Sequence, residues 1–418
     1  MLAEIILNAG REVGDGFYSL GQTCKRYCNV ELDKSIRGII HREGLSTRVI
    51  YYAAEDVEHL SKIKDVQLQQ LIELQLAKED TQDIYTVLGL ENNAVLAFAE
   101  IEYNGLKLDR VKWQEVKKMV QKEEQQVLKA LDYEVINNPK LKKFWSVYQD
   151  LFTSAEPRVN VNWSSPTQKL KVLNKVGKFE TTKMQELEKQ KRDYPLVDLL
   201  IKYNKINKLK TAFADKLESF INPQTHRIHT NFWQILNTGR VSCSEPNLQQ
   251  IPARTEIGGE MRKCFVVEDG YKMVGGDFSG CELRIIAEYS KDPVWLEAFL
   301  NDEDLHSKLC ALTFDIPIED VKKPSSFKPD LKYRDIQKTI NFGLAYGMSE
   351  FKLADTIEIP VPDAKAIIDK FFRAVPKVKQ FLDMLGKAGV SGGRIRTPPP
   401  YRRIRWFDDY KSDDRKIL

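Results

Sequence analysis

Two cations and two aromatic residues recur at intervals of four positions in the second half of the chain. Arg334 and Lys338 are followed by Phe342 and Tyr346. On an α-helix each lies about 40° from the previous one, so the four form one slowly drifting stripe. Such a stripe suits a nucleoside triphosphate, because phosphates need fixed positive charge and a sugar and base need a flat apolar surface. An amphipathic helix with incidental cations would show the same spacing.

A carboxylate follows a short apolar run earlier in the chain. Residues 272–276 predict a strand that ends at Asp277, and a helical stretch is expected after it. A carboxylate at a strand end is a natural metal ligand, because the strand fixes its position and the turn leaves it accessible. Most aspartates at strand ends serve turns or helix caps instead, so Asp277 alone does not assign a metal site.

The elements that must position these residues belong to an ordinary globular chain. Of 418 residues, 42% are hydrophobic and 30% are charged, which excludes a disordered protein. The length predicts about two or three domains. No apolar run approaches the roughly 18 residues of a membrane span, and the amino terminus lacks a secretory signal. We therefore expect a cytoplasmic protein, and the formal charge of +4 is only a weak argument for nucleic acid.

The cysteines exclude a disulfide framework or a zinc site of known spacing. There is no pair separated by two residues, and we expect buried reduced thiols instead. The six are Cys24, Cys28, Cys243, Cys264, Cys281 and Cys310.

Two lysine-rich segments have the spacing of amphipathic helices. Residues 111–131 carry apolar positions among lysines and glutamates, and residues 196–220 place lysines beside leucine and isoleucine. A solvated helix face explains either segment taken alone. Short strands and loops are expected from residue 226, and mostly helix over 300–385 with a polar loop near 322–326.

Taken together, five segments resemble motifs of the family A (polymerase I-like) DNA polymerases. Residues 277–284 (DFSGCELR) resemble the first catalytic motif of that family and residues 334–347 (RDIQKTINFGLAYG) its finger helix, in the family's order. The primer-template segment is similar to residues 238–242 and 246–252, and the segment that opens the thumb-to-palm region to residues 162–168. The resemblance spans nearly the whole chain.

The resemblance implies an α+β, helix-rich fold with the right-hand architecture of polymerases. It comprises a thumb, a partial palm and fingers, preceded by the end of a 3'-5' exonuclease domain. The implied segments are the exonuclease-like end at 1–93, the thumb at 94–225, the first part of the palm at 226–300, the fingers at 301–385, and a return toward the palm with a polar tail at 386–418.

The resemblance also implies roles in nucleotidyl transfer from dNTPs to a primer 3'-hydroxyl. Asp277 would bind two Mg²⁺ ions, one of which lowers the pKa of that hydroxyl, and Phe278 would add its backbone carbonyl. Arg334 and Lys338 would hold the triphosphate and neutralise charge as pyrophosphate leaves. These expectations follow from the family, not from the spacing.

Sugar and base selection are implied for three further positions. Glu282 resembles the family's steric gate, which packs where a ribose 2'-hydroxyl would lie and so disfavours RNA synthesis. Phe342 would lie beside the sugar, and Tyr346 would occupy the template-base position and move as the fingers close. The chain departs from the family pattern at Gly280, where relatives commonly carry glutamine.

Contacts with primer-template DNA are implied elsewhere. Arg240, Asn247 and Gln249 match residues that line the duplex near the primer end, where minor-groove donors can test pair shape without reading sequence. The basic segment that follows the fingers is similar to residues 393–405, which include Arg402 and Arg403, although three prolines interrupt it. The lysine-rich helices would contact phosphates.

The amino-terminal segment mixes short helical and extended signals and carries an incomplete exonuclease motif. Tyr52 and Asp56 match the family's Tyr-x-x-x-Asp, flanked by residues 32–35 and by two alanines. In the family, the Asp-x-Glu motif and a second aspartate of that site should precede Met1. We expect no exonuclease activity from this chain alone.

The second catalytic acid of the family is also missing. It belongs to a His-Asp-Glu motif downstream of the fingers, whereas the histidines here are His41, His59, His226, His229 and His306. The remaining acid pairs, Asp408-Asp409 and Asp413-Asp414, read as a solvated tail. A palm without its hairpin would leave apolar surface uncovered, so we expect that a second polypeptide supplies the missing part or that it was cut away. We expect the protein in a bacterium or a phage-infected cell. The alternative is a catalytically inactive DNA-binding or assembly subunit of polymerase shape.

Overall fold

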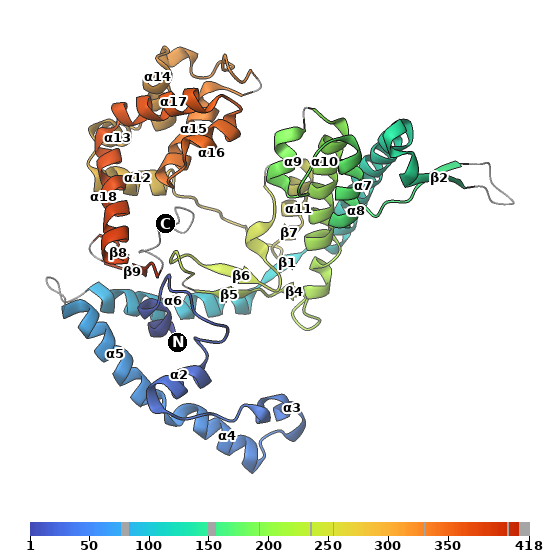
Figure 1. Cartoon of the computed structure of the whole chain (residues 1–418). Helices are drawn as coiled ribbons and strands as arrows, with labels where there is room; N and C mark the ends of the chain where they lie inside the picture. Colours follow the sequence, from blue (N-terminus) through green and yellow to red (C-terminus); the bar gives the residue numbers. More distant parts are fainter. Residues whose placement is uncertain are drawn as a thin grey trace. The chain divides into compact units, whose positions relative to one another are not determined.

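The computed structural model describes residues 1–76, 83–148, 156–191, 193–234, 236–253, 255–329, 331–398 and 401–408. Helices dominate these residues and the strands are short, which confirms the expected helix-rich α+β class (Figure 1). The chain divides into two compact units, each with hydrophobic cores of its own. Unit 1 comprises residues 1–97, 234–241 and 276–418, and unit 2 comprises residues 98–233 and 242–275.

Unit 2 is built on two long helices that pack against each other. α7 (Arg110–Asn137) is capped at its amino end by Asp109, whose carboxylate accepts a hydrogen bond of 3.1 Å from the backbone N–H of Lys112. α10 (Pro195–Leu209) begins at a proline and continues into a π turn. Both predicted amphipathic helices are therefore confirmed, the second with an irregular end. The unit also contains α8 (Pro166–Val176), α9 (Met184–Gln190), α11 (Glu256–Lys263) and the 3₁₀ helix η2 (Pro139–Phe144).

The strands of unit 2 form three small antiparallel sheets. β1 (Leu106–Leu108) lies between β4 (Arg227–Ile228) and β7 (Phe265–Val266). β2 (Trp145–Tyr148) pairs with β3 (Glu156–Val159), and β5 (Asn231–Trp233) pairs with β6 (Ser242–Ser244). Short strands after residue 226 were expected, and β4 to β7 confirm them.

The amino-terminal part of unit 1 is helical. The extended signals in residues 1–90 correspond to no strand among the described residues, because each apolar run there forms one face of a helix that packs on its neighbours. The elements are α1 (Leu2–Leu7), α2 (Leu20–Cys28), η1 (Ser35–Gly38), α3 (Ile40–Glu43), α4 (Thr47–Glu58), α5 (Leu60–Leu76) and α6 (Asp83–Asn104), the last continuing into unit 2.

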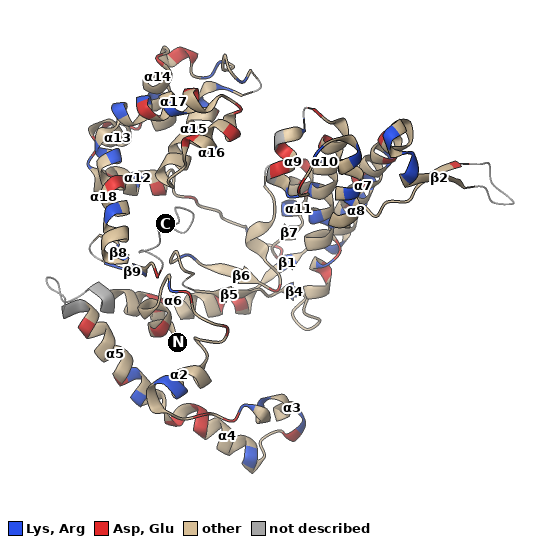
Figure 2. Ribbon diagram, in the orientation of Figure 1, with Lys and Arg blue, Asp and Glu red and all other residues tan. Residues whose placement is uncertain are grey.

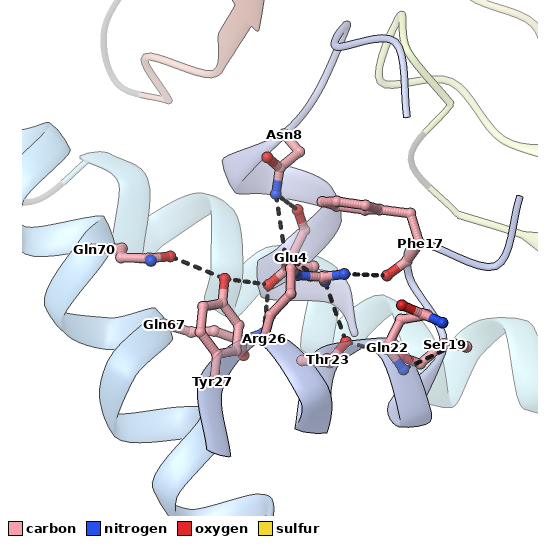
Figure 3. A network of polar contacts seen from close by, with 10 residues as sticks. All are labelled: Glu4, Asn8, Phe17, Ser19, Gln22, Thr23, Arg26, Tyr27, Gln67 and Gln70. Carbon is pink, nitrogen blue, oxygen red and sulfur yellow. Dashed lines mark hydrogen bonds and ion pairs between the residues drawn. The ribbon is translucent and has the colours of Figure 1, made fainter. Parts of the chain in front are cut away.

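A buried carboxylate joins three of these helices. Glu4 on α1 is only 1% exposed, and its oxygens accept hydrogen bonds from Arg26, Tyr27 and Gln67 at 2.8 to 2.9 Å (Figure 3). Burial and the neighbouring Glu4 raise the pKa of Tyr27 to about 12. The charge is compensated by Arg26, so the carboxylate ties α1 to α2 and α5 instead of marking a reactive site.

The carboxy-terminal strands of unit 1 pack on its amino-terminal helices. β8 (Arg394–Arg396) pairs with β9 (Ile404–Trp406), and Ile404 joins a core with Ile6 and Leu7. The indole Nε1 of Trp406 donates to the Leu7 carbonyl at 2.9 Å. Gly10 has φ +90°, and a Cβ there would lie 2.5 Å from the Trp406 carbonyl oxygen, so this close approach requires glycine.

The remaining part of unit 1 is a helical bundle around one apolar core. Trp295, Leu309, Ile340 and Phe371 are fully buried in it. Residues 321–329 form a loop, as expected from the polar segment near 322–326. The helices are α12 (Cys281–Ser290), α13 (Pro293–Leu300), α14 (Leu305–Phe314), α15 (Tyr333–Ala345), α16 (Glu350–Ile357), α17 (Val361–Ala374) and α18 (Pro376–Gly392).

Two sequence predictions are wrong. Residues 272–276 form no strand: Met273 and Val274 are 57% and 90% exposed, and no described strand lies alongside to accept and donate backbone hydrogen bonds. The thiols are all free but not all buried, because Cys281 occupies the exposed face of α12 and Cys28 is half-buried. Among the described helices, none is long and apolar enough to cross a membrane.

Candidate functional site

Six residues predicted from the sequence line one cavity in unit 1. The cavity has a volume of about 750 Å³ and lies between the start of α12 and one face of α15. The residues are Asp277, Phe278, Glu282, Arg334, Lys338 and Phe342. The cavity therefore brings together two cations, two carboxylates and two aromatic rings.

The burial pattern of α15 explains why three residues of the predicted stripe line the cavity. Ile336, Ile340 and Leu344 are at most 3% exposed and pack into the core of the bundle. Arg334, Lys338 and Phe342 lie on other faces of the same helix, as the fourfold spacing predicted. Tyr346 follows the last helical residue and is 65% exposed, so it lies beyond the regular stripe.

The turn before α12 positions Asp277 and Glu282. Gly280 is the residue before the first turn of α12 and has φ 60° and ψ 30°. This left-handed conformation is strained for residues with a side chain, which gives a physical reason for glycine at this position, where the sequence departs from the family pattern.

Arg334 already has a carboxylate partner that the sequence did not indicate. Its Nε donates to Asp304 Oδ2 at 2.5 Å and its Nη2 to Oδ1 at 2.9 Å, a two-pronged ion pair. Partial burial alone would raise the pKa of Asp304, but hydrogen bonds from Arg334 and Ser307 outweigh it and lower the pKa to about 2. Lys338 has no carboxylate within 4.0 Å among the described residues, so it is the less neutralised of the two cations.

A chain of buried amides orients a histidine at the cavity wall. Gln337 Nε2 donates to Asn341 Oδ1 at 2.6 Å, and Asn341 Nδ2 lies 2.8 Å from His306 Nδ1. If Asn341 donates, the proton of the neutral imidazole is on Nε2. Burial lowers the pKa of His306. The signal that could have found this histidine is the pair Gln337 and Asn341, because two polar residues four positions apart on a buried helix face require a polar partner.

Glu282 and Tyr346 are joined by Arg240. Arg240 Nη2 forms an ion pair with Glu282 and lies 3.2 Å from Tyr346 Oη. Burial and the neighbouring Glu282 raise the pKa of Tyr346. Arg240 therefore contacts both Glu282 and Tyr346 within unit 1. The three residues were predicted for different roles, in the primer segment, the sugar gate and the template position.

The described residues provide only part of a metal site. Asp277 is exposed and provides a carboxylate, with the carbonyl of Phe278 next to it. No group of three or more His, Cys, Asp or Glu side chains within the described ranges could hold an ion. Oxygen donors suit Mg²⁺, but these residues do not by themselves fit a two-ion site.

The remaining predicted residues lie elsewhere. Asn247 and Gln249 lie at the 3₁₀ turn η5 (Leu248–Gln250) of unit 2. In unit 1, Arg402 and Arg403 are half-buried, and Arg403 pairs with Glu91 on α6. The predicted DNA contacts of these four residues stay predictions. Asp408 accepts a 2.9 Å hydrogen bond from the backbone N–H of Glu12, whereas Asp409, Asp413 and Asp414 lie outside the described residues.

The aspartate of the exonuclease-like motif forms an ion pair with a lysine of the same chain. Lys34 forms a salt bridge with Asp56 and lies 5.3 Å from the ring centroid of Tyr52. Tyr52 is 8% exposed and packs with Ile36 and Val49. The ammonium group of Lys34 therefore occupies the carboxylate of Asp56, which in an exonuclease would bind a metal ion. The geometry fits a structural contact.

Comparisons with known proteins converge on one family. The model of DNA polymerase family A matches residues 115–417. DNA polymerase I of Caldicellulosiruptor bescii is 31% identical over 390 residues, 89% of this chain and 42% of its own length. DNA polymerase I of Pseudomonas aeruginosa is 38% identical over 231 residues, 54% of this chain and 24% of its own length.

A solved structure covers the whole chain. The POL domain of Pol1 from M. smegmatis, in complex with DNA primer-template and dNTP, aligns with a TM-score of 0.70 and 26% identity, over 100% of this chain and 65% of that one. The chain spans less than half the length of the two curated relatives.

Proposed function

Because this chain belongs to DNA polymerase family A, we propose that it forms the nucleotide-binding part of a site that adds deoxynucleotides to a primer 3'-hydroxyl on a DNA template. The observation that supports this proposal most directly is the cavity that gathers Asp277, Arg334, Lys338 and Phe342. DNA binding alone requires none of these four side chains. A role in DNA replication or repair follows from the activity.

Charge in the cavity suits the triphosphate. Lys338 is the less neutralised cation, and the guanidinium of Arg334 is held in a fixed direction by Asp304. Fixed donors that face the leaving pyrophosphate stabilise charge as it develops and need no reorganisation at that moment. If Asn341 donates to it, His306 adds a neutral Nε2–H donor at the same wall.

Sugar selection would depend on Glu282 together with Arg240. The ion pair between them fixes the carboxylate at the mouth of the cavity, where a ribose 2'-hydroxyl would meet it. Phe342 offers a flat apolar surface to the sugar. Arg240, Asn247 and Gln249 would contact the duplex near the primer end, with the helices of unit 2 as the thumb and α14 to α17 as the fingers.

A second polypeptide would complete the palm. Asp277 and the Phe278 carbonyl would hold Mg²⁺ only with carboxylates from outside the described residues. When bound, the ions would lower the pKa of the attacking hydroxyl and clamp the triphosphate. The segment 272–276 is exposed and pairs with no strand in the described ranges. This supports the proposal, because a strand from such a partner would satisfy its backbone groups.

Mixing the chain with a polypeptide that carries the His-Asp-Glu hairpin tests the proposal. We expect magnesium-dependent primer extension from the mixture and, with Asp277→Asn, a loss of at least about a hundredfold, the order found when a preorganised catalytic group is removed. Asp269→Asn, an exposed acid eight positions upstream, is the matched control and should retain activity.

The competing function, an inactive DNA-binding subunit, predicts a different outcome. Extension would then be absent from the folded mixture, and Asp277→Asn would leave DNA binding and any assembly role unchanged. Absence of extension with both chains folded would count against the polymerase proposal, whereas unchanged DNA binding by Asp277→Asn is expected under both functions.

A further inference from the structure

The loop before α15 is closed by the side chain of one tyrosine. The loop comprises residues 321–329 and 331–332 of the described chain, and Tyr333 is the first residue of the helix that follows. The hydroxyl of Tyr333 accepts a hydrogen bond of 3.1 Å from the backbone N–H of Ser326 and donates one of 2.9 Å to Ser326 Oγ. Compact loops that are packed by their own side chains are frequently functional, so we ask what this loop holds in place.

The tyrosine ring packs where the loop meets α14 and α15. Its centroid lies 5.3 Å from that of Phe314, the last residue of α14, and 5.8 Å from that of Phe327 in the loop. The centroids of Phe314 and Phe327 are 5.6 Å apart. Aromatic pairs at these separations stabilise a structure beyond the burial of their surface. The three rings therefore hold the loop, the end of α14 and the start of α15 together.

Backbone contacts join the two ends of the loop. Pro324 forms an antiparallel bridge with Lys332, and the backbone N–H of Ser325 donates to the Leu331 carbonyl at 2.8 Å. Ser325 is only 2% exposed, and its Oγ bonds both the N–H and the carbonyl of Lys328 at 2.9 Å. The loop therefore follows one path over the start of α15.

Ion pairs attach the loop to the rest of unit 1. The loop is rich in lysine (Figure 2). Lys328 Nζ lies 3.0 Å from Glu358 Oε1 at the end of α16, and Lys323 pairs with Asp320. These two lysines fix the loop to its own unit.

The loop supplies acceptors that the start of α15 lacks. The first N–H groups of a helix have no acceptor within the helix, and the side chain of Lys332, which precedes the first turn, makes no capping hydrogen bond. Instead the Lys323 carbonyl accepts from the N–H of Tyr333 at 3.2 Å, and the Val321 carbonyl accepts from the N–H of Arg334 at 2.9 Å. The loop therefore fixes the backbone of Arg334, whose side chain lines the nucleotide cavity.

α14 contacts the start of α15 at both of its own ends. Asp304, the residue before α14, pairs with the guanidinium of Arg334, and Phe314 at the other end contacts the ring of Tyr333. Two separated contacts prevent a rotation that one contact would allow. The ion pair restrains the guanidinium, and the loop restrains the backbone that carries it.

We propose that Tyr333 is a positioning residue for the triphosphate, which acts through the loop and the backbone of Arg334. This inference rests on the proposed function, because it explains what holds one of the two cations toward the phosphates. Tyr333 does not line the cavity itself. Without its hydroxyl the loop opens at Ser326 and the N–H of Arg334 loses a fixed acceptor. The guanidinium then meets the phosphates in more than one direction.

Binding of a fluorescent dNTP to the full chain tests this role. Tyr333→Phe keeps the ring and removes only the hydroxyl. Poorer alignment of one charge-assisted contact should weaken binding about fivefold, whereas Arg334→Ala, which removes the contact, should weaken it at least roughly tenfold. Ser325→Ala opens the same loop at a second point and should also weaken binding. Unchanged binding by both loop variants would overturn the proposal.

A double-mutant cycle separates positioning from stability. In the Arg334→Ala background, Tyr333→Phe should cause no further loss of triphosphate affinity, because the group that it positions is gone. A purely structural role would lower the melting temperature and reduce the affinity by the same factor in both backgrounds. Equal factors would therefore overturn the positioning role.

The matched control is Tyr51→Phe. Tyr51 lies on α4 of the same unit and is 70% exposed, so removal of its hydroxyl should leave the dNTP affinity unchanged. An equal loss of affinity in Tyr51→Phe and Tyr333→Phe would show that the effect does not depend on the loop, and the proposal would fall.

Failure of the positioning role and failure of the proposed function are distinguishable. If the unaltered chain binds the dNTP and Arg334→Ala weakens binding, but Tyr333→Phe does not, only the positioning role is overturned. If the unaltered chain does not bind the dNTP, or if Arg334→Ala binds it equally well, the nucleotide site and the positioning role fall together.

Discussion

At the scale of single residues, the groups that hold the polar side chains of the cavity in place matter as much as those side chains themselves. Asp304 takes two of the donors of Arg334, and the Gln337–Asn341 pair fixes the ring of His306. A phosphate that enters the cavity therefore meets donors whose directions are already set. This preorganisation is what distinguishes the cavity from a surface with scattered lysines.

His306 should make the stability of unit 1 depend on pH. Burial lowers its pKa below the ordinary value of 6.5, so below that pH the unfolded chain takes up a proton more readily than the folded one. The contribution of neutral His306 to the free energy of unfolding should be fully present above pH 6.5. It should decrease as the pH falls below 6.5 toward the lowered pKa of the folded state. Urea unfolding between about pH 5 and 7 measures this slope.

The variant His306→Asn should lose that part of the slope. His41→Asn, at an exposed position on α3, is the control and should keep it. Equal slopes in the unaltered chain and in His306→Asn would show that the ring is not restrained as the structure places it.

At the scale of elements, regular helices were predictable and pairing partners were not. The spacing of the apolar residues Ile336, Ile340 and Leu344 predicts the helix α15, because an apolar stripe can be read from neighbouring positions in the sequence. The run at 272–276 has strand composition, but a strand also requires a neighbour, and none of the described strands lies beside it. The same limit hid the Asp304–Arg334 pair, since contacts 30 residues apart leave no periodic signal.

Strand β9 illustrates a contact that only the structure reveals. Ile404 is 2% exposed and packs with Ile6 and Leu7, almost 400 positions away in the chain. Ile404→Ala should lower the free energy of unfolding of unit 1 by about 2–5 kcal/mol, because a buried side chain is lost and a cavity remains. Ile318→Ala, at a position 55% exposed in the same unit, should change it little. Equal effects of the two variants in chemical denaturation would contradict the packing of β9 on α1.

At the scale of the whole molecule, the chain passes between its two units several times. Unit 2 interrupts unit 1 twice, yet none of the buried cores among the described residues combines residues of the two units. Separate cores allow separate unfolding, since cooperativity depends on contacts that both parts lose together. The segments that resemble the family are likewise divided, with residues 277–284 and 334–347 in unit 1 and residues 162–168 and 246–252 in unit 2.

We therefore expect two thermal transitions, one for each unit. Leu131 is fully buried in unit 2, so Leu131→Ala should lower the midpoint of one transition by on the order of 10 °C and leave the other unchanged. Ile404→Ala should do the reverse. Val111→Ala, 75% exposed on α7, is the control within unit 2 and should shift neither. Differential scanning calorimetry separates the outcomes, because a single transition that both core variants lower equally would mean that the two units unfold as one.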